Sequence, residues 1–173
     1  VAAMTKNKNI PNLLFTGPPG IGKSTLAIVI AKELFGTSWK ESFLELNSSD
    51  ERGIDVVRGI IKDFSRTKSM VNIPYRIIFL DECDQLTKEA QNALRRTMEN
   101  FTQNVRFILS CNFSSKIIDA IQSRCTVFRF KSMDNASMAK IIEKISSSEK
   151  LVMDKKAIDA INNISDGDVR KAI

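Results

Sequence analysis

The sequence of 173 residues contains no histidine, and its three cysteines, Cys83, Cys111 and Cys125, stand far apart with no CxxC pair. Imidazole nitrogens and clustered thiolates are the usual ligands of zinc in proteins. The sequence therefore excludes a zinc site and any catalysis through histidine. Thiols that are few and widely spaced are typical of reduced cysteines inside a cell.

Long apolar runs are also missing. No run approaches the roughly 18 residues that a helix needs to cross a bilayer, and no charged segment followed by an apolar stretch opens the chain. We therefore expect neither a membrane partner nor secretion. The net charge of +6 favours an anionic partner, while 43% apolar residues suffice for a core.

Apolar strand-like runs alternate with helix-like segments over most of the chain. The expected strands are 12–17, 43–47, 76–82, 105–112 and 126–130, and the expected helices between them include 23–35, 55–66 and a helix that Thr87 caps and that reaches Asn100. Apolar strands separated by helices predict a five-stranded parallel sheet with helices on both faces. After residue 131 only helices are expected, at 134–149, 154–164 and from 167, so we predict a core over 1–131 and a helical domain over 132–173.

A glycine-rich motif, GPPGIGKS, lies between the first expected strand and the first expected helix. It fits the P-loop pattern G-x-x-x-x-G-K-[ST] in the structural context that the motif requires. Its backbone N–H groups can wrap phosphates, Lys23 would reach the β- and γ-phosphates, and the Ser24 hydroxyl would bind Mg²⁺. The predicted loop comprises Gly17, Pro18, Pro19, Gly20, Ile21, Gly22, Lys23, Ser24 and Thr25.

Two carboxylates, Asp81 and Glu82, end the apolar run IIFLDE. Open α/β sheets place their ligands at the carboxyl ends of their strands. Beside a P-loop, Asp81 is therefore expected to hold Mg²⁺ through a water molecule, and Glu82 to act as the base that orients an attacking water. A solvated strand end or a helix cap is the alternative.

Asn112 ends the run VRFILSCN. If that strand lies beside the P-loop strand, the amide would face the γ-phosphate and could hold the water. An ordinary turn asparagine is the alternative.

The expected helix 55–66 carries a row of cations, Arg58, Lys62 and Arg66. At 100° per residue these fall opposite an apolar face formed by Val56, Val57, Ile60, Ile61 and Phe64. Cations four residues apart can follow a phosphate backbone without reading bases. The alternative is a solvated helix face, which Asp55 and Asp63 partly balance.

Arg124, in QSRC, has no evident acidic partner near it in the sequence. A surface arginine before a strand is one explanation. A guanidinium is also well suited to neutralising phosphate charge.

Seven segments, GPPGIGKST, LNSSDERGIDVVR, IIFLDECD, ALRRTME, FILSCN, IQSRC and GDVRKAI, follow one another between Asn9 and Ile173. In this order they resemble the small subunits of replication factor C, the sliding-clamp loader of eukaryotes and archaea, which is an AAA+ ATPase. The P-loop is shared with many superfamilies. SRC together with LNSSDERGI and ALRRTME is specific to clamp loaders.

The resemblance implies an α/β fold, an AAA+ P-loop NTPase core followed by a small all-helical lid, that binds ATP with Mg²⁺. The P-loop would be Walker A, Asp81 and Glu82 Walker B, and Asn112 sensor 1. Arg170 resembles the sensor 2 arginine, which reaches ATP from the lid. Arg124 resembles the arginine finger, which completes hydrolysis in trans at the ATP of a neighbouring subunit.

The resemblance also implies partners. The row of Arg58, Lys62 and Arg66 matches the basic helix that faces DNA, while Arg95 and Arg96 lie in a helix that couples DNA contact to the ATP site. The expected partners are the other subunits of a hetero-pentamer, a ring-shaped sliding clamp and the backbone phosphates of primer–template DNA, during DNA replication and repair. A nuclear location is expected for a eukaryotic source and a cytoplasmic one for an archaeal source.

The chain departs from the family pattern in places. Ile21 replaces a common threonine and DECD replaces DEAD, and both changes spare the ligating side chains. Both ends look cut, so we expect a fragment without the adenine-binding segment and the collar domain of the family. Two other functions stay open: another AAA+ DNA motor such as a branch-migration helicase, and a scaffold subunit that binds nucleotide without turnover. The presence of Lys23, Asp81 and Glu82 argues against the scaffold.

Overall fold

The computed structural model describes residues 8–50, 53–66 and 75–173. Within it the chain forms two compact units. The larger comprises the described residues of Val1–Thr16 and Ser24–Phe128, and the smaller comprises Gly17–Lys23 and Arg129–Ile173. Part of the clamp-loader segment LNSSDERGI, at residues 51–52, lies outside the described residues.

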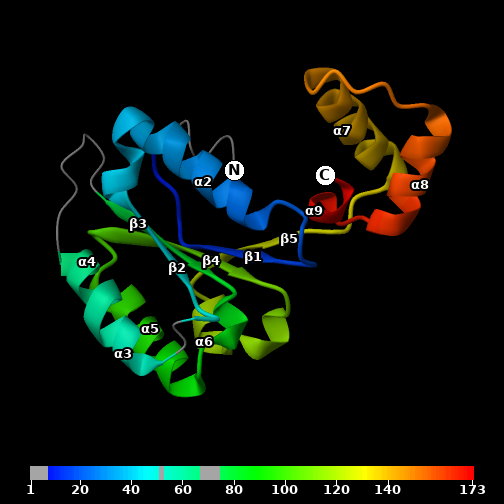
Figure 1. Ribbon diagram of the computed structural model, residues 1–173. Coiled ribbons are helices and arrows are strands. Elements are labelled where there is room, and N and C mark those ends of the chain that lie inside the picture. The colour runs from blue at the N-terminus through cyan, green and yellow to red at the C-terminus, as the bar shows by residue number, and fades with distance from the viewer. Residues whose placement is uncertain (1–7, 51–52, 67–74) are drawn as a thin grey trace. The chain divides into compact units, whose positions relative to one another are not determined.

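A five-stranded sheet forms the centre of the fold, with the order β2-β3-β4-β1-β5 (Figure 1). Its strands are β1 (Leu13–Thr16), β2 (Phe43–Asn47), β3 (Arg76–Asp81), β4 (Val105–Cys111) and β5 (Thr126–Arg129). The pairs β1–β4, β2–β3 and β3–β4 are parallel. The prediction of a five-stranded parallel sheet is confirmed.

Helices cover both faces of this sheet. Figure 1 shows α2 (Lys23–Phe35) over one face and α3 (Ile54–Val56), α4 (Lys62–Arg66) and α5 (Lys88–Asn100) over the other. Strand side chains such as Leu14, Ile78 and Leu109 are completely buried, and they pack with Leu94 of α5 in one apolar cluster. The inner strands β1, β3 and β4 are apolar on both sides because both sides meet helices.

Local signals fix two helix ends, and the predicted Thr87 cap is confirmed. The Thr87 side chain accepts a hydrogen bond from the Ala90 N–H at 3.2 Å and so caps α5. Gly36, with φ of +58°, follows α2 in the left-handed conformation that ends many helices. Sequence reasoning missed the short elements η1 (Gly36–Ser42), η3 (Cys83–Gln85), η4 (Ser114–Lys116) and α6 (Asp119–Gln122).

The helical segment 54–66 contains a π-helical turn, η2 (Val57–Ile61), between α3 and α4. A π turn holds more residues than an α turn, so each residue rotates the chain by less than 100°. The apolar face predicted from regular α-helical spacing is therefore wrong at Ile60, which is 45% exposed. Val57 and Ile61 are buried, and Ser65 takes the next buried position on this face.

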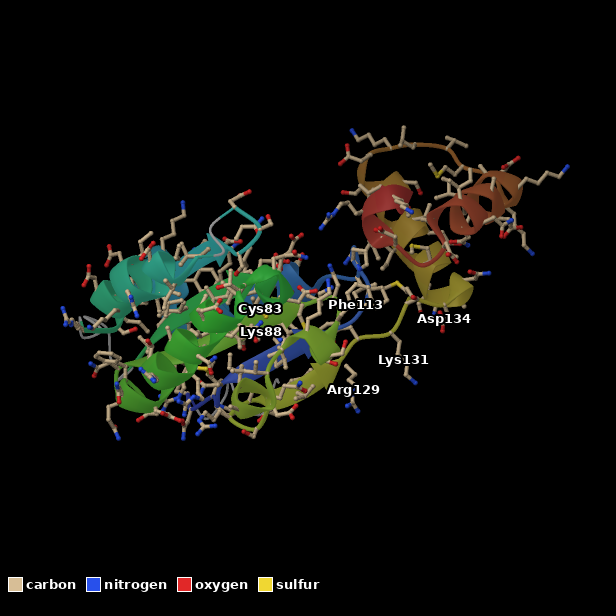
Figure 2. All side chains as sticks on the ribbon, turned by 90° about the horizontal axis from the view of Figure 1, so that it is seen from below. Cys83, Lys88, Phe113, Arg129, Lys131 and Asp134 are labelled. Carbon is tan, nitrogen blue, oxygen red and sulfur yellow. The ribbon has the colours of Figure 1, made fainter. Side chains whose placement is uncertain are left out.

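The smaller unit contains α7 (Asn135–Ser148), α8 (Lys155–Ser165) and α9 (Val169–Ala172) in addition to the loop Gly17–Lys23. Each helix begins after an aspartate whose carboxylate accepts hydrogen bonds from its first turn: Asp134, Asp154 and Asp168. Asp134 is labelled at the start of α7 in Figure 2. The helical C-terminal portion agrees with the predicted fold class. Over the part of the chain described, no helix has the length and apolar character to cross a membrane.

The π turn generates a matched test. Ile61→Ala should reduce the free energy of unfolding by about 2–5 kcal/mol, because it empties a buried site. Ile60→Ala should cost less than about 1 kcal/mol, because its side chain is half in solvent. Urea denaturation of the two variants measures both losses. Equal losses would show that both isoleucines face the core. They would contradict the conclusion that the π turn rotates Ile60 out of the buried face.

Candidate functional site

One hydrogen bond joins the first turn of α2 to the end of β3. The Ser24 hydroxyl donates to Oδ2 of Asp81 at 2.5 Å, and the other carboxylate oxygen accepts the Glu82 N–H at 2.9 Å. Both oxygens of Asp81 therefore have a donor that fixes their direction. A hydroxyl and a carboxylate held together supply the oxygen ligands that Mg²⁺ prefers, so these residues fit the predicted metal role.

Glu82 adopts a left-handed backbone conformation, with φ of 51° and ψ of 38°. Such values are uncommon for residues other than glycine, and strained residues concentrate at functional sites. This conformation ends β3 abruptly and starts η3. Glu82 is half-buried at this turn, directly after Asp81.

Asn112 follows β4, and β4 lies directly beside β1, with Cys111 opposite Thr16. The condition set for Asn112, that its strand should neighbour the P-loop strand, is therefore met. The next residue, Phe113, donates its N–H to Oδ2 of Asp84 at 3.4 Å, a contact between the segments that follow β4 and β3. Figure 2 labels Cys83, Lys88 and Phe113 on these segments.

Within the smaller unit, the Lys23 ammonium lies over its own loop. It donates to the carbonyl oxygens of Gly17 at 2.7 Å and Pro18 at 2.6 Å, and the residue is buried. A lysine folded onto a glycine-rich loop brings its charge beside the backbone N–H groups that can bind an anion. Of the other predicted loop residues, Pro18, Pro19, Gly22 and Thr25 are exposed and Gly17, Gly20 and Ile21 are half-buried.

The loop also contacts the start of α9 in the same unit. The Val169 N–H donates to the Gly20 carbonyl at 3.0 Å. A Cβ at Gly20, whose φ is +71°, would overlap the Asp168 carboxylate, so glycine is required there by both backbone and space. Asp168 was not predicted, although an aspartate just before a helical segment is a recognisable cap signal. Arg170 donates its N–H to Asp168, and its side chain is exposed.

A hollow of about 500 Å³ lies between the segment 54–66 and α5. Four basic side chains line it, those of Arg58, Lys62, Arg95 and Arg96, together with one acidic side chain, Glu89. The third member of the predicted cationic row, Arg66, is not among the lining residues and lies 3.7 Å from Asp63. Two members of the row thus share one concave surface with two arginines of α5.

Arg124 has an acidic partner in the fold, although none lies near it in the sequence. Its Nη2 lies 2.6 Å from Oε1 of Glu99 on α5. Its Nη1 donates to the Ala120 carbonyl at 2.6 Å. The partner was missed because it is distant in sequence and is brought close only by the packing of α5 against α6.

The three cysteines each adjoin a predicted site residue: Cys83 follows Glu82, Cys111 precedes Asn112 and Cys125 follows Arg124. Burial raises the pKa of Cys83 well above its ordinary value, helped by a hydrogen bond with Cys111, and burial raises the pKa of Cys125 to about 12. A nucleophilic cysteine must be a thiolate. The raised pKa values keep the Cys83 and Cys125 thiols protonated, so neither is activated as a nucleophile.

Curated proteins with similar sequences include replication factor C small subunits of archaea. The chain is 55% identical to the replication factor C small subunit of Methanococcus vannielii, over 97% of this chain and 53% of that protein. The same name belongs to proteins of Picrophilus torridus, 55% identical over 99% of the chain and 54% of that protein, and Haloarcula marismortui, 57% identical over 95% and 50%. The chain spans about half the length of these curated relatives. The predicted resemblance is confirmed.

Solved structures share the fold at lower identity. The Holliday junction branch migration motor RuvB of Thermotoga maritima superposes with a TM-score of 0.80 over 99% of this chain and 55% of that one, at 22% identity. At that identity the likeness shows the fold alone.

Residues 13–133 match the family model of the ATPase family associated with various cellular activities, AAA. The match includes β1 and the whole P-loop, as well as Asp81, Glu82, Asn112 and Arg124. It covers well over half of the chain. The chain therefore belongs to the AAA family of ATPases.

Proposed function

We propose that this chain is part of an ATP-hydrolysing subunit of a sliding-clamp loader of the replication factor C type. The observation that carries the proposal is the meeting of Ser24 and Asp81, in a chain 55% identical to proteins of that name. P-loop NTPases hold the phosphates and Mg²⁺ with a P-loop hydroxyl and a carboxylate that follows a buried strand. We assign residues 1–131 to the ATPase core and 132–173 to the helical lid.

The nucleotide is assigned to the P-loop, Gly17 to Thr25. Its glycines permit close approach of backbone N–H groups to phosphate oxygens, and Lys23 adds a positive charge to the same loop. Mg²⁺, when bound, would neutralise phosphate charge. Ser24 is its proposed direct ligand, and Asp81 would hold it through a water molecule.

Hydrolysis is assigned to Glu82 and Asn112. The Glu82 carboxylate would accept a proton from the attacking water, and the Asn112 amide would keep that water oriented. Positioning and charge neutralisation dominate catalysis in this reaction class, because the protein forms no covalent bond to the phosphoryl group. Arg170 is proposed as the arginine that reaches ATP from the lid, a role that rests on the family resemblance.

Arg124 is proposed to act in trans, on ATP held by the neighbouring subunit. Its side chain is 38% exposed, so its guanidinium is accessible from outside the chain. A guanidinium binds phosphate oxygens through two parallel hydrogen bonds. ATP sites completed between subunits would make hydrolysis depend on assembly.

The basic hollow is proposed as the contact for primer–template DNA. Arg58 and Lys62 line it with Arg95 and Arg96, and the concave surface concentrates positive charge. Such contacts bind backbone phosphates without reading bases. Arg66, one turn beyond Lys62, is proposed as an additional phosphate contact.

The further partners proposed are the other subunits of a hetero-pentamer and a ring-shaped clamp. The likeness to RuvB is one of fold and does not favour a branch-migration motor. The relatives named above are archaeal, and for an archaeal source the expected location is the cytoplasm.

Glu82→Gln keeps the size of the side chain and removes its charge. In the full-length protein with its partners, it should lower kcat for DNA-stimulated ATP hydrolysis by about 100-fold or more, because the base is lost. ATP affinity should stay within a few-fold of the original. Glu45→Gln, at an exposed position of β2, serves as the control. Unchanged turnover in Glu82→Gln would remove the catalytic assignment.

Arg58→Gln and Lys62→Gln should each weaken binding of primer–template DNA to a similar degree for all sequences. Each should also reduce the slope of log affinity against log salt by about 1, since each phosphate contact releases about one counterion. Fluorescence anisotropy at several salt concentrations measures both effects. The control is Lys40→Gln, an exposed residue of η1. A slope identical to the control would exclude these residues from the phosphate contact.

Arg124→Ala should leave ATP binding by its own chain intact while slowing hydrolysis at the neighbouring subunit by about 10³-fold or more. Equilibrium titration with nucleotide and single-turnover hydrolysis in the assembled complex measure the two properties separately. Loss of binding by the substituted chain itself would contradict the action in trans.

A further inference from the structure

A single carboxylate oxygen on α5 holds two arginines. Oε1 of Glu99 lies 2.6 Å from Nη2 of Arg124 and 3.1 Å from Nη1 of Arg95. Arg95 lines the basic hollow, whereas Arg124 follows α6. Glu99 is therefore placed between a surface proposed for DNA and an arginine proposed for ATP hydrolysis.

The Arg124 guanidinium is held at both of its terminal nitrogens. Nη2 pairs with Glu99, and Nη1 donates to the Ala120 carbonyl at 2.6 Å. Arginine has several rotatable bonds, so an exposed arginine without such partners would sample many directions. Two fixed acceptors on different helices, α5 and α6, restrict it to one direction.

Arg95 in turn orients Glu99. The two residues are four apart on α5, with the cation on the N-terminal side, which is the less favourable order for a helical ion pair. Arg124 is a second cation that pairs with the same carboxylate oxygen of Glu99. The order of contact is thus Arg95, Glu99 and Arg124, along a path from the hollow to the arginine.

The Glu99–Arg124 pair is suited to positioning rather than to permanent capture. The two side chains are 36% and 38% exposed, and ion pairs at such exposure contribute little net stability. Phosphate oxygens, with more charge and a bidentate geometry, can therefore replace the carboxylate at the guanidinium. Glu99 directs Arg124 without preventing its transfer to a phosphate.

We propose that Glu99 is the positioning residue of Arg124. It fixes the orientation of the guanidinium at the surface of the subunit, and the ion pair with Arg95 holds Glu99 in place. The inference rests on the proposed function of Arg124 at the ATP of a neighbouring subunit. It adds a residue that contacts no substrate and acts only through Arg124.

The test is DNA-stimulated, single-turnover ATP hydrolysis by the assembled full-length protein. Glu99→Gln keeps the size of the side chain and should lower the maximal rate about tenfold, with the ATP concentration for half-maximal rate unchanged, because a misdirected guanidinium affects only the transition state. Glu99→Asp retains the charge and should recover part of the loss. Glu33→Gln, at an exposed position of α2, is the matched control and should behave as the original.

A double variant decides whether Glu99 acts through Arg124. Glu99→Gln combined with Arg124→Ala should be no slower than Arg124→Ala alone, whereas independent effects would multiply. Multiplication, or weakened ATP binding in Glu99→Gln, would assign Glu99 a general structural role and overturn the inference. If Arg124→Ala is slow but Glu99→Gln keeps the original rate, the inference about Glu99 is overturned while the proposed function of Arg124 is left intact. An unchanged rate in Arg124→Ala would overturn both.

Discussion

Parallel hydrogen bonding of β3 and β1 to the central strand β4 brings the carboxyl ends of three strands to one edge of the sheet. Asp81 ends β3, Asn112 follows β4, and the P-loop follows Thr16 at the end of β1. A register shift of one residue would turn Asp81 to the opposite face and separate it from Ser24. The nucleotide chemistry proposed for the chain thus depends on a backbone pairing that buried apolar side chains enforce.

The helix α5 packs in the core and supplies residues to two of the other proposed sites. Its buried residues, among them Ala90, Leu94 and Met98, anchor it in the apolar cluster beneath the sheet. Its exposed side supplies Arg95 and Arg96 to the basic hollow and Glu99 to Arg124. One helix therefore carries both part of the surface proposed for DNA and the acidic partner of Arg124.

Much of the fold could be predicted because its signals are local. The five strands are apolar runs bounded by turn residues, and Thr87 and Gly36 mark helix ends by their own chemistry. The exposure of Ile60 was predicted wrongly, because the prediction assumed regular α-helical rotation and no sequence signal indicates a π turn. The partner of Arg124 was missed for a different reason. Glu99 becomes its neighbour only through tertiary packing, as Asp168 becomes the neighbour of Gly20.

The central claim is that the P-loop and Asp81 together bind a nucleotide with its metal ion. Equilibrium titration of the full-length protein with a fluorescent ATP analogue, with and without Mg²⁺, tests it most directly. We expect binding that requires Mg²⁺, is lost in Lys23→Ala, and in Asp81→Asn becomes weaker and less dependent on Mg²⁺. Binding that both variants leave unchanged would contradict the account.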